Sequence, residues 1–253
     1  MVSSVKAAYN IDAILFDMNG TLRMRVPDRA FQDQSVKLLM ELLELPNAPA
    51  SLPDELTRRY KSYTQWANEN GVSLSEAEIW TQWITPEMPP ERIEPRAAEL
   101  LLALRNCKGR TTLKPEAAQV VTELHQRGYR LGIVSNTTFS LDLPRFIHES
   151  NLNDFFEAVI LSSTFGYRKP TPEIFWEAAR GLNVKPEQCA YLGNNYANDV
   201  VGSRNAGFGM TLLIGLNSIN GYWQYSNEKP DALLHSLNDL LDLFPPRSRS
   251  KMA

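Results

Sequence analysis

The stretch from residue 11 to residue 22, Ile-Asp-Ala-Ile-Leu-Phe-Asp-Met-Asn-Gly-Thr-Leu, constrains the fold more than any other part of the chain. Its apolar run, residues 13–16, does not alternate with polar residues, so both faces of the predicted strand must be covered, as in a parallel sheet between helices. Asp17 follows at the carboxyl end of this strand, where ligands bind in open α/β sheets, and Gly20 lets the backbone turn back over the ligand. Asp17 is therefore a nucleophile or a metal ligand, unless it only caps the following turn.

The composition is that of an ordinary globular protein and limits the classes of function. The 253 residues are enough for a core domain with an insertion, and a net charge of -3 gives no general attraction to nucleic acid or to anionic membranes. No apolar run reaches transmembrane length and residues 1–10 lack the pattern of a signal peptide, so we expect a cytoplasmic protein. Cys107 and Cys189 are too few for a disulfide framework.

Residues 27–109 carry no strand pattern and are predicted to form an inserted helical domain. Apolar residues at helical spacing predict helices over 28–45 and 52–70, a third that begins at Ser75, and a fourth over 95–106. Four helices with short connections indicate a small bundle. One stripe contains Tyr60, Tyr63 and Trp66, and such a stripe is more typical of a bundle core than of contacts with a substrate.

Beyond residue 109, helix and strand patterns alternate, which indicates a parallel sheet with crossover helices. Strands are predicted over 129–134, 157–161, 188–192 and 210–214, and helices over 115–127, 143–150, 197–205 and 231–243, with another that begins at Thr171. The predicted fold is α/β, a Rossmann-like doubly wound parallel sheet built from residues 1–26 and 110–244. Residues 27–109 form the inserted helical bundle, and residues 245–253 are expected to be a disordered tail.

Polar segments follow separate predicted elements: Asp17, then Ser135 and Asn136, then Lys169, and then residues 194–199. Because the carboxyl ends of parallel strands share one edge, we expect these segments to meet. In this order they resemble the haloacid dehalogenase-like (HAD) superfamily of hydrolases. The pattern of that superfamily is an Asp-x-Asp-Gly-Thr loop, a Ser or Thr, a Lys, and a Gly-Asp-x-x-x-x-Asp loop. The resemblance spans nearly the whole chain and is to the phosphatase type, with a helical cap between the first two motifs.

The resemblance implies an aspartyl-enzyme mechanism, in which Asp17 accepts the phosphoryl group of a small phosphorylated substrate and water then releases it. It implies a catalytic set and a phosphate-binding set that share Lys169: catalytic Asp17, Asn19 and Lys169, and phosphate-binding Gly20, Thr21, Ser135, Asn136 and Lys169. It also implies a Mg²⁺ site, whose residues would be Asp17, Asn19 through its main-chain carbonyl, Asn194, and Asp199 in support. The helical cap would close over this site and exclude water.

Two positions depart from the family pattern. Phosphatases of the family carry Asp where this chain has Asn19; that Asp protonates the leaving oxygen and then activates water, a contribution of roughly 10² to 10⁴ in rate. Asn194 replaces a metal-binding Asp and offers an oxygen without charge, so Mg²⁺ should bind more weakly. The chain is then an impaired or specialised phosphatase, a phosphatase with substitutions introduced to trap a complex, a metal-independent 2-haloacid-type dehalogenase, or a catalytically silent phospho-ligand-binding pseudoenzyme.

Arg23 and Arg25 follow the nucleophile loop at the start of the predicted insertion. They either contact an anionic substrate or are solvated, and solvation is the more typical state of two arginines in a loop.

Overall fold

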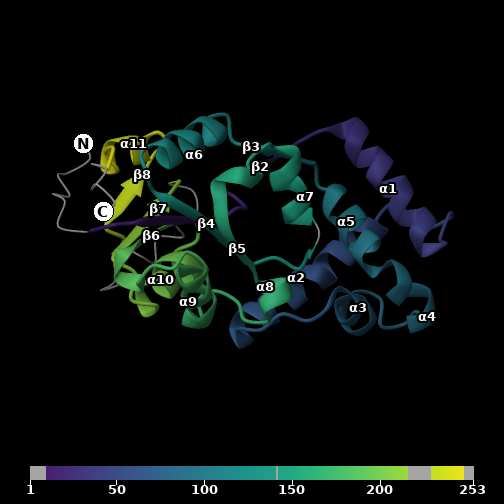
Figure 1. Ribbon diagram of the computed structural model, residues 1–253. Helices are drawn as coiled ribbons and strands as arrows, with labels where there is room; N and C mark the ends of the chain where they lie inside the picture. The colour runs from purple at the N-terminus through teal and green to yellow at the C-terminus, as the bar shows by residue number, and fades with distance from the viewer. Residues whose placement is uncertain (1–9, 141, 216–228, 248–253) are drawn as a thin grey trace.

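The computed structural model describes residues 10–140, 142–215 and 229–247, and its centre is a six-stranded sheet (Figure 1). All of its strand pairs are parallel, in the order β5-β4-β1-β6-β7-β8. The strands are β1 (Ala13–Phe16), β4 (Arg130–Ser135), β5 (Phe156–Leu161), β6 (Cys189–Gly193), β7 (Met210–Ile214) and β8 (Ala232–Leu234). β1 lies in the middle, with Phe16 in register with Ile133 on one side and Leu192 on the other, so the residues after these three strands meet at one edge.

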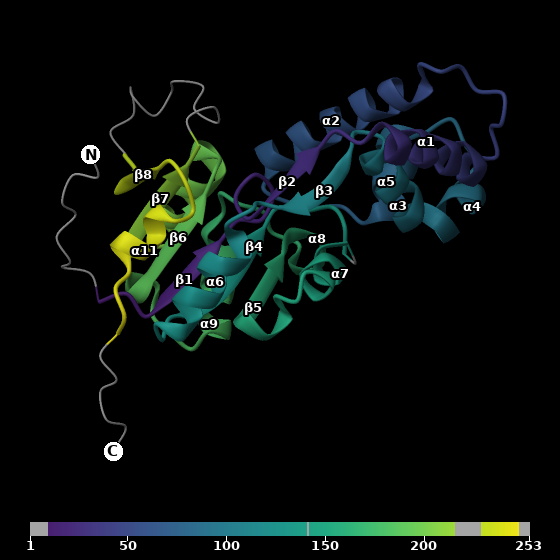
Figure 2. The ribbon, with the colours of Figure 1, turned by 90° about the horizontal axis from the view of Figure 1, so that it is seen from above.

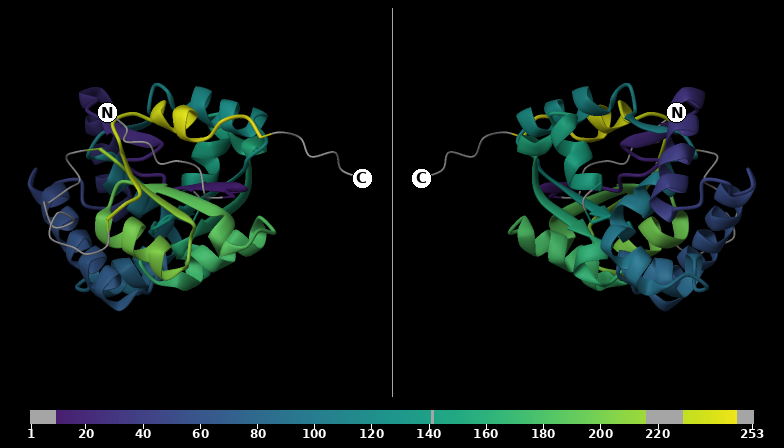
Figure 3. Two further views of the ribbon diagram at one scale, coloured as in Figure 1. Left: turned by 90° about the vertical axis from the view of Figure 1, so that its left-hand side faces the viewer. Right: turned by 90° about the vertical axis from the view of Figure 1, so that its right-hand side faces the viewer.

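Helices cover both faces of the sheet, as the uninterrupted apolar strands require (Figure 3). One face packs against α6 (Ala117–Gln126), α7 (Asp142–Glu149) and α11 (Asp239–Leu243), and the other against α9 (Pro172–Gly181) and α10 (Val201–Asn205). In β1, Ile14 and Phe16 belong to the first core and Ala13 and Leu15 to the second. The short helix α8 (Ser162–Phe165) follows β5, and the 3-10 turns η3 (Asn153–Phe155) and η4 (Pro186–Gln188) precede β5 and β6. The predicted α/β fold is confirmed.

A group of helices lies beyond the carboxyl end of β1, to one side of the sheet (Figure 2). It comprises α1 (Arg29–Leu43), α2 (Leu52–Asn70), α3 (Glu76–Ile79), α4 (Pro90–Ile93) and α5 (Ala97–Asn106), and we call it the helical region. The predicted third helix is interrupted, because α3 runs into a π-helical turn, η1 (Trp80–Ile84), and the 3-10 turn η2 (Glu94–Arg96) leads into α5. The region has its own apolar core, in which Tyr63 and Trp80 are fully buried.

A two-stranded antiparallel ribbon, absent from the sequence-based prediction, connects the sheet to the helical region. β2 (Arg23–Val26) leads out and β3 (Arg110–Leu113) leads back, and Val26 pairs with Arg110 (Figure 2). The sequence Arg-Met-Arg-Val alternates between polar and apolar side chains, which is the strand period, and Arg-Thr-Thr-Leu contains two β-branched residues, which favour strands. Only four residues long, each pattern is too short to be distinguished from a loop.

The prediction of one closing helix over 231–243 is wrong in its first half. Residues 232–234 form β8 beside β7, and only Asp239–Leu243 is helical. Asp231 accepts the main-chain N–H of Thr211 at 2.7 Å, which holds β8 against the sheet. Similarly, the helix predicted over 197–205 begins with a π-helical turn, η5 (Tyr196–Val200). Of the predicted tail, residues 248–253 lie outside the described residues. Among the described helices, none combines the length and apolarity needed to cross a membrane.

Candidate active site

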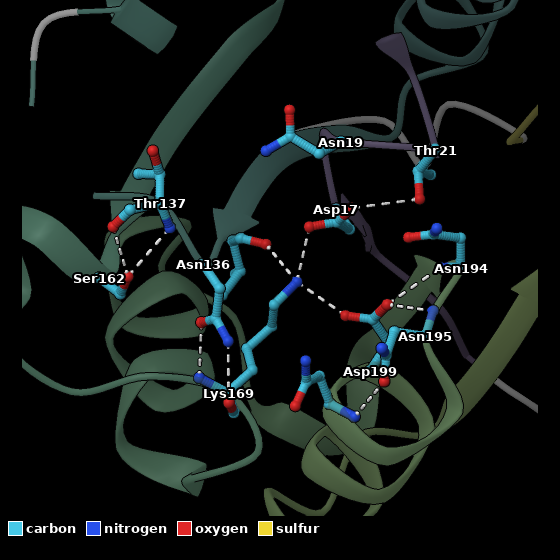
Figure 4. Close-up of polar contacts among 12 residues, drawn as sticks. Asp17, Asn19, Thr21, Asn136, Thr137, Ser162, Lys169, Asn194, Asn195 and Asp199 are labelled. Atoms are coloured by element: carbon cyan, nitrogen blue, oxygen red, sulfur yellow. Dashed lines mark hydrogen bonds and ion pairs between the residues drawn. The ribbon is translucent and has the colours of Figure 1, made fainter. Parts of the chain in front are cut away.

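Two carboxylates and one ammonium group meet at the carboxyl edge of the sheet (Figure 4). Asp17 is the first residue after β1, and its main-chain N–H donates to the carbonyl oxygen of Leu192 at 2.8 Å. Lys169 Nζ lies 2.7 Å from Asp17 Oδ1 and 2.7 Å from Asp199 Oδ1. All three side chains are buried, so water screens these charges little. Residues that are far apart in sequence are thus brought into direct contact.

Tyr191, which the sequence analysis did not single out, completes the surroundings of Lys169. Lys169 Nζ donates to Tyr191 Oη at 2.7 Å and to the carbonyl oxygen of Val134 at 3.0 Å, in addition to the two carboxylates. An ammonium group has three N–H bonds, and four oxygens already surround this one. The Lys169 ammonium group therefore has no N–H free for a further partner, and its ion pair with Asp17 holds that carboxylate in one orientation. The sequence does contain a signal that could have identified Tyr191. It is a tyrosine within a strand that is apolar throughout, and the hydroxyl of a buried tyrosine needs a hydrogen-bond partner.

Burial and charge act in opposite directions on the ionisation of the pair. Burial favours the neutral amine of Lys169, but Asp17 and Asp199 outweigh it and raise the pKa of Lys169 above its ordinary value of 10.5. Burial raises the pKa of Asp17, and the Lys169 charge opposes that rise. Because the pKa of Lys169 is higher in the folded state, its contribution to stability is complete below pH 10.5 and is lost only above it.

Lys169→Met should lower the free energy of unfolding by about 3–5 kcal/mol at pH 7.5, because it leaves two carboxylates buried without their counter-charge. Their pKa values should then rise, so the loss should shrink as the pH falls and these groups become protonated. Urea unfolding at pH 5 and 7.5 measures both effects. Lys37→Met, on the exposed face of α1, is the matched control and should change stability little. Equal stability of Lys169→Met and the parent at pH 7.5 would contradict the proposed network.

Ser135 and Asn136, at the end of β4, have different roles in the structure. The hydroxyl of Ser135 is fully buried and has no hydrogen-bond partner among the described residues. Such a group is costly unless a ligand satisfies it. The side-chain amide of Asn136 forms two hydrogen bonds with the main chain of Lys169, one from Nδ2 to the carbonyl oxygen at 2.9 Å and one from the Lys169 N–H to Oδ1 at 2.8 Å. The Asn136 side chain thus holds Lys169 in place, and Ser135 is the free donor.

Asn19 is exposed and its side chain points away from Lys169 (Figure 4). Its Oδ1 accepts a hydrogen bond from Arg23 Nε at 2.8 Å. The expectation that Arg23 is solvated is wrong: the side chain is 1% exposed and pairs with Asp142 at 3.0 Å. Burial, together with the neighbouring charge of Arg105, lowers the pKa of Arg23 to about 10. Arg25, by contrast, is exposed.

Two glycines allow the loops around Asp17 and Asp199 to approach closely. Asp199 Oδ2 accepts the main-chain N–H groups of Asn194 at 2.9 Å and Asn195 at 2.8 Å. A Cβ on Gly193 would lie 2.2 Å from this carboxylate, so only glycine fits. Gly20 has a φ of +89°, and a Cβ there would lie 2.3 Å from the side-chain amide of Asn194. The loop that contains Gly20 and the loop that contains Asn194 are therefore in contact.

The oxygens at this edge do not fit a tightly bound magnesium ion. Both carboxylate oxygens of Asp199 already have hydrogen-bond or ion-pair partners. Of the two carboxylates, only Asp17 has an oxygen left for a metal ion, Oδ2, which lies 3.4 Å from the Thr21 hydroxyl. The Asn19 carbonyl and the Asn194 side chain would add neutral oxygens only. The described residues contain no group of three His, Cys, Asp or Glu that could hold a metal ion. One carboxylate oxygen beside an ammonium group supports weak binding of Mg²⁺.

A cavity of about 700 Å³ opens beside Asn19 and Gly20, between the sheet edge and the helical region. Residues of β2, α2 and α5 line it, together with residues 136–139 and Arg168. Among the described residues, no Asp, Glu, His or Cys lines this cavity. A ligand there would therefore meet no carboxyl or imidazole group able to protonate it.

Comparisons with known proteins give consistent results. A family model described as haloacid dehalogenase-like hydrolase matches residues 11–207. A phosphoglycolate phosphatase from Nitrosococcus oceani is 29% identical over 235 residues, which cover 92% of this chain and 96% of that protein. The pyrophosphatase PpaX from Bacillus anthracis is 32% identical over 132 residues, 52% of this chain and 59% of that protein.

Solved structures agree with the fold. A HAD phosphatase from Thermococcus onnurineus has a TM-score of 0.62 at 22% identity and covers 94% of this chain and 99% of its own. A 2-haloacid dehalogenase from Pseudomonas syringae has a TM-score of 0.65 at 18% identity, with 92% of this chain and 97% of its own covered. At these identities the likeness shows the fold alone.

Proposed function

This chain belongs to the haloacid dehalogenase-like hydrolases, and we propose that it is a phosphatase that acts on small phosphorylated substrates through an aspartyl-phosphate on Asp17. The observation that carries the proposal is the buried contact of Asp17 with Lys169. Asp17 itself does not line the cavity, but Asn19 and Gly20, which follow it in the same loop, do. A carboxylate held in one orientation by a fixed ammonium group is suited to in-line attack on phosphorus. The unsatisfied hydroxyl of Ser135 supports an oxyanion ligand at the same edge.

In the first proposed step, a carboxylate oxygen of Asp17 forms a bond to phosphorus while the bond to the leaving alcohol oxygen breaks, and the alkoxide takes a proton from solvent. In the second, water attacks the phosphorus and gives up a proton to solvent, the bond to Asp17 breaks with its electron pair returning to the carboxylate, and inorganic phosphate leaves. Ser135 would donate a hydrogen bond to a phosphoryl oxygen, and Lys169 would offset the charge. Phosphatases of this family generally use Mg²⁺, but the oxygens present support only weak binding, so these steps are assigned to protein groups.

The helical region is proposed to act as a cap. In this proposal residues 27–109 form the cap on a core of residues 1–26 and 110–244. Tyr60 and Lys61 of α2 and Leu104 of α5 line the cavity from the helical side, while Asn136 lines it from the sheet. Closure would exclude water from Asp17 while its bond to phosphorus forms, and opening would then admit the solvent that protonates the leaving alkoxide.

The proposed phosphatase lacks a general acid and is therefore specialised for substrates whose leaving oxygen needs no proton. Phosphate release from a series of aryl phosphates is the test, with kcat/KM plotted against the pKa of the leaving phenol. We expect kcat/KM to fall steeply as that pKa rises, because Asn19 cannot supply a proton. A flat plot would contradict the absence of a general acid, and no phosphate release from any ester would contradict the phosphatase proposal.

A metal-independent dehalogenase is the second candidate, favoured by the weak metal donors and by the lack of an acid in the cavity. Asp17 would attack the carbon that bears the halogen, the halide would leave without a proton, and water would hydrolyse the resulting ester. Halide release from 2-chloropropionate in the presence of a chelator distinguishes it from the phosphatase. A protein that binds a phospho-ligand and turns over neither class of substrate would instead be the silent binder.

A further inference from the structure

The cavity beside Asn19 carries charge of one sign. Among the described residues, every charged side chain that lines it is basic: Arg23, Arg25, Lys61, Arg105, Lys108 and Arg168. They come from β2, from α2, from the end of α5 and from the segment before α9. The transferred phosphoryl group would lie at Asp17, beside Lys169. That single group does not account for six cations spread over the opposite walls.

Part of this charge is compensated by carboxylates that do not line the cavity. Arg23 and Arg105 share one carboxylate, Asp142, at 3.0 and 2.5 Å. Lys108 pairs with Asp54 at 2.6 Å, and the Asp54 side chain is 78% exposed. Three cations are therefore offset by two carboxylates, one of them exposed to solvent that weakens its effect.

The other three cations form no ion pair with a carboxylate among the described residues, although the charge of Asp142 acts on Arg25 from a greater distance. Arg168 is only 3% exposed, and its guanidinium contacts neutral oxygens alone, those of Asn68, Ser73 and Ser162. Arg25 and Lys61 form no ion pair with the described part of the chain. Burial lowers the pKa of Arg168, which reflects the cost of an uncompensated charge at this place. An anionic ligand would relieve that cost.

Tyr60 lines the cavity together with these cations. Its hydroxyl shares a hydrogen bond of 2.6 Å with Thr138 Oγ1. Burial raises the pKa of Tyr60, and the positive charges of Arg168 and Arg105 oppose that rise. The cavity also has apolar lining, formed by Leu101, Leu104 and Phe139. The space thus offers an apolar surface for the body of a ligand and several cations beyond it.

We propose that the alcohol part of the substrate carries a second anionic group, a carboxylate or a phosphate, and that this group binds at Arg25, Lys61 and Arg168. The inference rests on the proposed phosphatase activity, because it takes the phosphoryl end of the substrate to lie at Asp17. The second anion supplies the direct ion-pair partner that these three cations lack among the described residues. It also distinguishes the preferred substrate from a neutral ester of the same size.

Binding to Asp17→Asn, measured by calorimetry, tests the subsite without turnover. The probes are 3-carboxyphenyl phosphate and 3-carbamoylphenyl phosphate, which differ in one charge and little in size. We expect the carboxylate to bind at least about tenfold more tightly. Benzene-1,3-diyl bisphosphate in the same assay shows whether a phosphate is preferred to a carboxylate. Equal affinity for all three probes would overturn the proposal.

Charge-removing variants assign the preference to the named residues. Arg25→Gln with Lys61→Gln, in the Asp17→Asn protein, should remove most of the ratio between the charged and neutral probes. Arg58→Gln is the matched control, because Arg58 lies on α2 like Lys61 but is exposed and does not line the cavity. A ratio that survives the double change would overturn the assignment. A further outcome is that the parent protein releases phosphate from no ester while Asp17→Asn still binds the charged probe more tightly than the neutral one. In that case the phosphatase proposal fails and the anion subsite stands.

Discussion

Asp17→Asn is expected to abolish turnover, with a loss of at least about 10⁴-fold, because it removes the one group that can form the covalent intermediate. The amide is close in shape to the carboxylate and can still accept a hydrogen bond from Lys169, so the fold and the phosphate site should persist. The measurement is phosphate release from a reactive aryl phosphate, with circular dichroism to verify folding.

Asp12→Asn is the matched control for this variant. Asp12 lies just before the opposite end of β1, where it accepts hydrogen bonds from Gln188 and Arg247, far from the carboxyl edge. It tests whether loss of any carboxylate along this strand reduces activity, and its rate should match the parent within about twofold. Substantial turnover by a clean preparation of Asp17→Asn would rule out the aspartyl-enzyme mechanism.

Asn19→Asp combined with Asn194→Asp should raise the hydrolysis of alkyl phosphates by roughly 10² to 10⁴, the usual worth of a general acid or base. The first change adds a proton donor for the leaving oxygen, and the second adds a carboxylate oxygen for Mg²⁺, so the new activity should depend on magnesium. Asn19 is exposed and is followed by Gly20, so slow deamidation can create the same carboxyl group. Mass spectrometry of freshly prepared parent protein is therefore the necessary control.

The pH dependence of this double variant tests the contact with Arg23. The introduced carboxyl group would take the place of the Asn19 amide, which lies 2.8 Å from Arg23 Nε. The guanidinium should hold the pKa of that carboxyl below its usual range, so the protonated acid is present only at low pH. The gain with alkyl phosphates should accordingly fall as the pH rises through a midpoint below about 3.9, the ordinary pKa of an Asp carboxyl. A midpoint at or above that value would show that the contact is not retained.

Much of the sheet and of the site was predictable because the signals were local. An unbroken apolar run followed by a polar residue marks the end of a buried strand, and this pattern predicts the positions of Asp17 and Ser135 from the sequence alone. Lys169 stands before Pro170 and the Thr171-Pro172 helix start, a signal that depends on neighbouring residues alone. Thr171 occupies the N-cap position, although its hydroxyl donates to the carbonyl oxygen of Arg168 and not to the helix.

The rest depends on partners that are distant in sequence. Ala-Leu-Leu in β8 is equally suited to a helix, and its strand conformation comes from pairing with β7. Arg23 resembles a solvated loop arginine until Asp142, at a sequence separation of 119, is placed beside it. Tyr191 is one aromatic residue in an apolar strand, and only the fold shows that its hydroxyl contacts Lys169. Such roles follow from tertiary contacts, which no local pattern records.

The ribbon of β2 and β3 has a consequence for how this protein can be altered. Val26 and Arg110 are register partners, so the chain leaves for the helical region and returns from it at adjacent positions. Paired residues of antiparallel strands have Cα atoms roughly 4.5–5.5 Å apart, a gap that a two-residue hairpin turn closes. The segment between them can therefore be shortened, exchanged or deleted if the chain is rejoined at these two adjacent positions. Neither the register of the six-stranded sheet nor the position of Asp17 at the end of β1 would have to change.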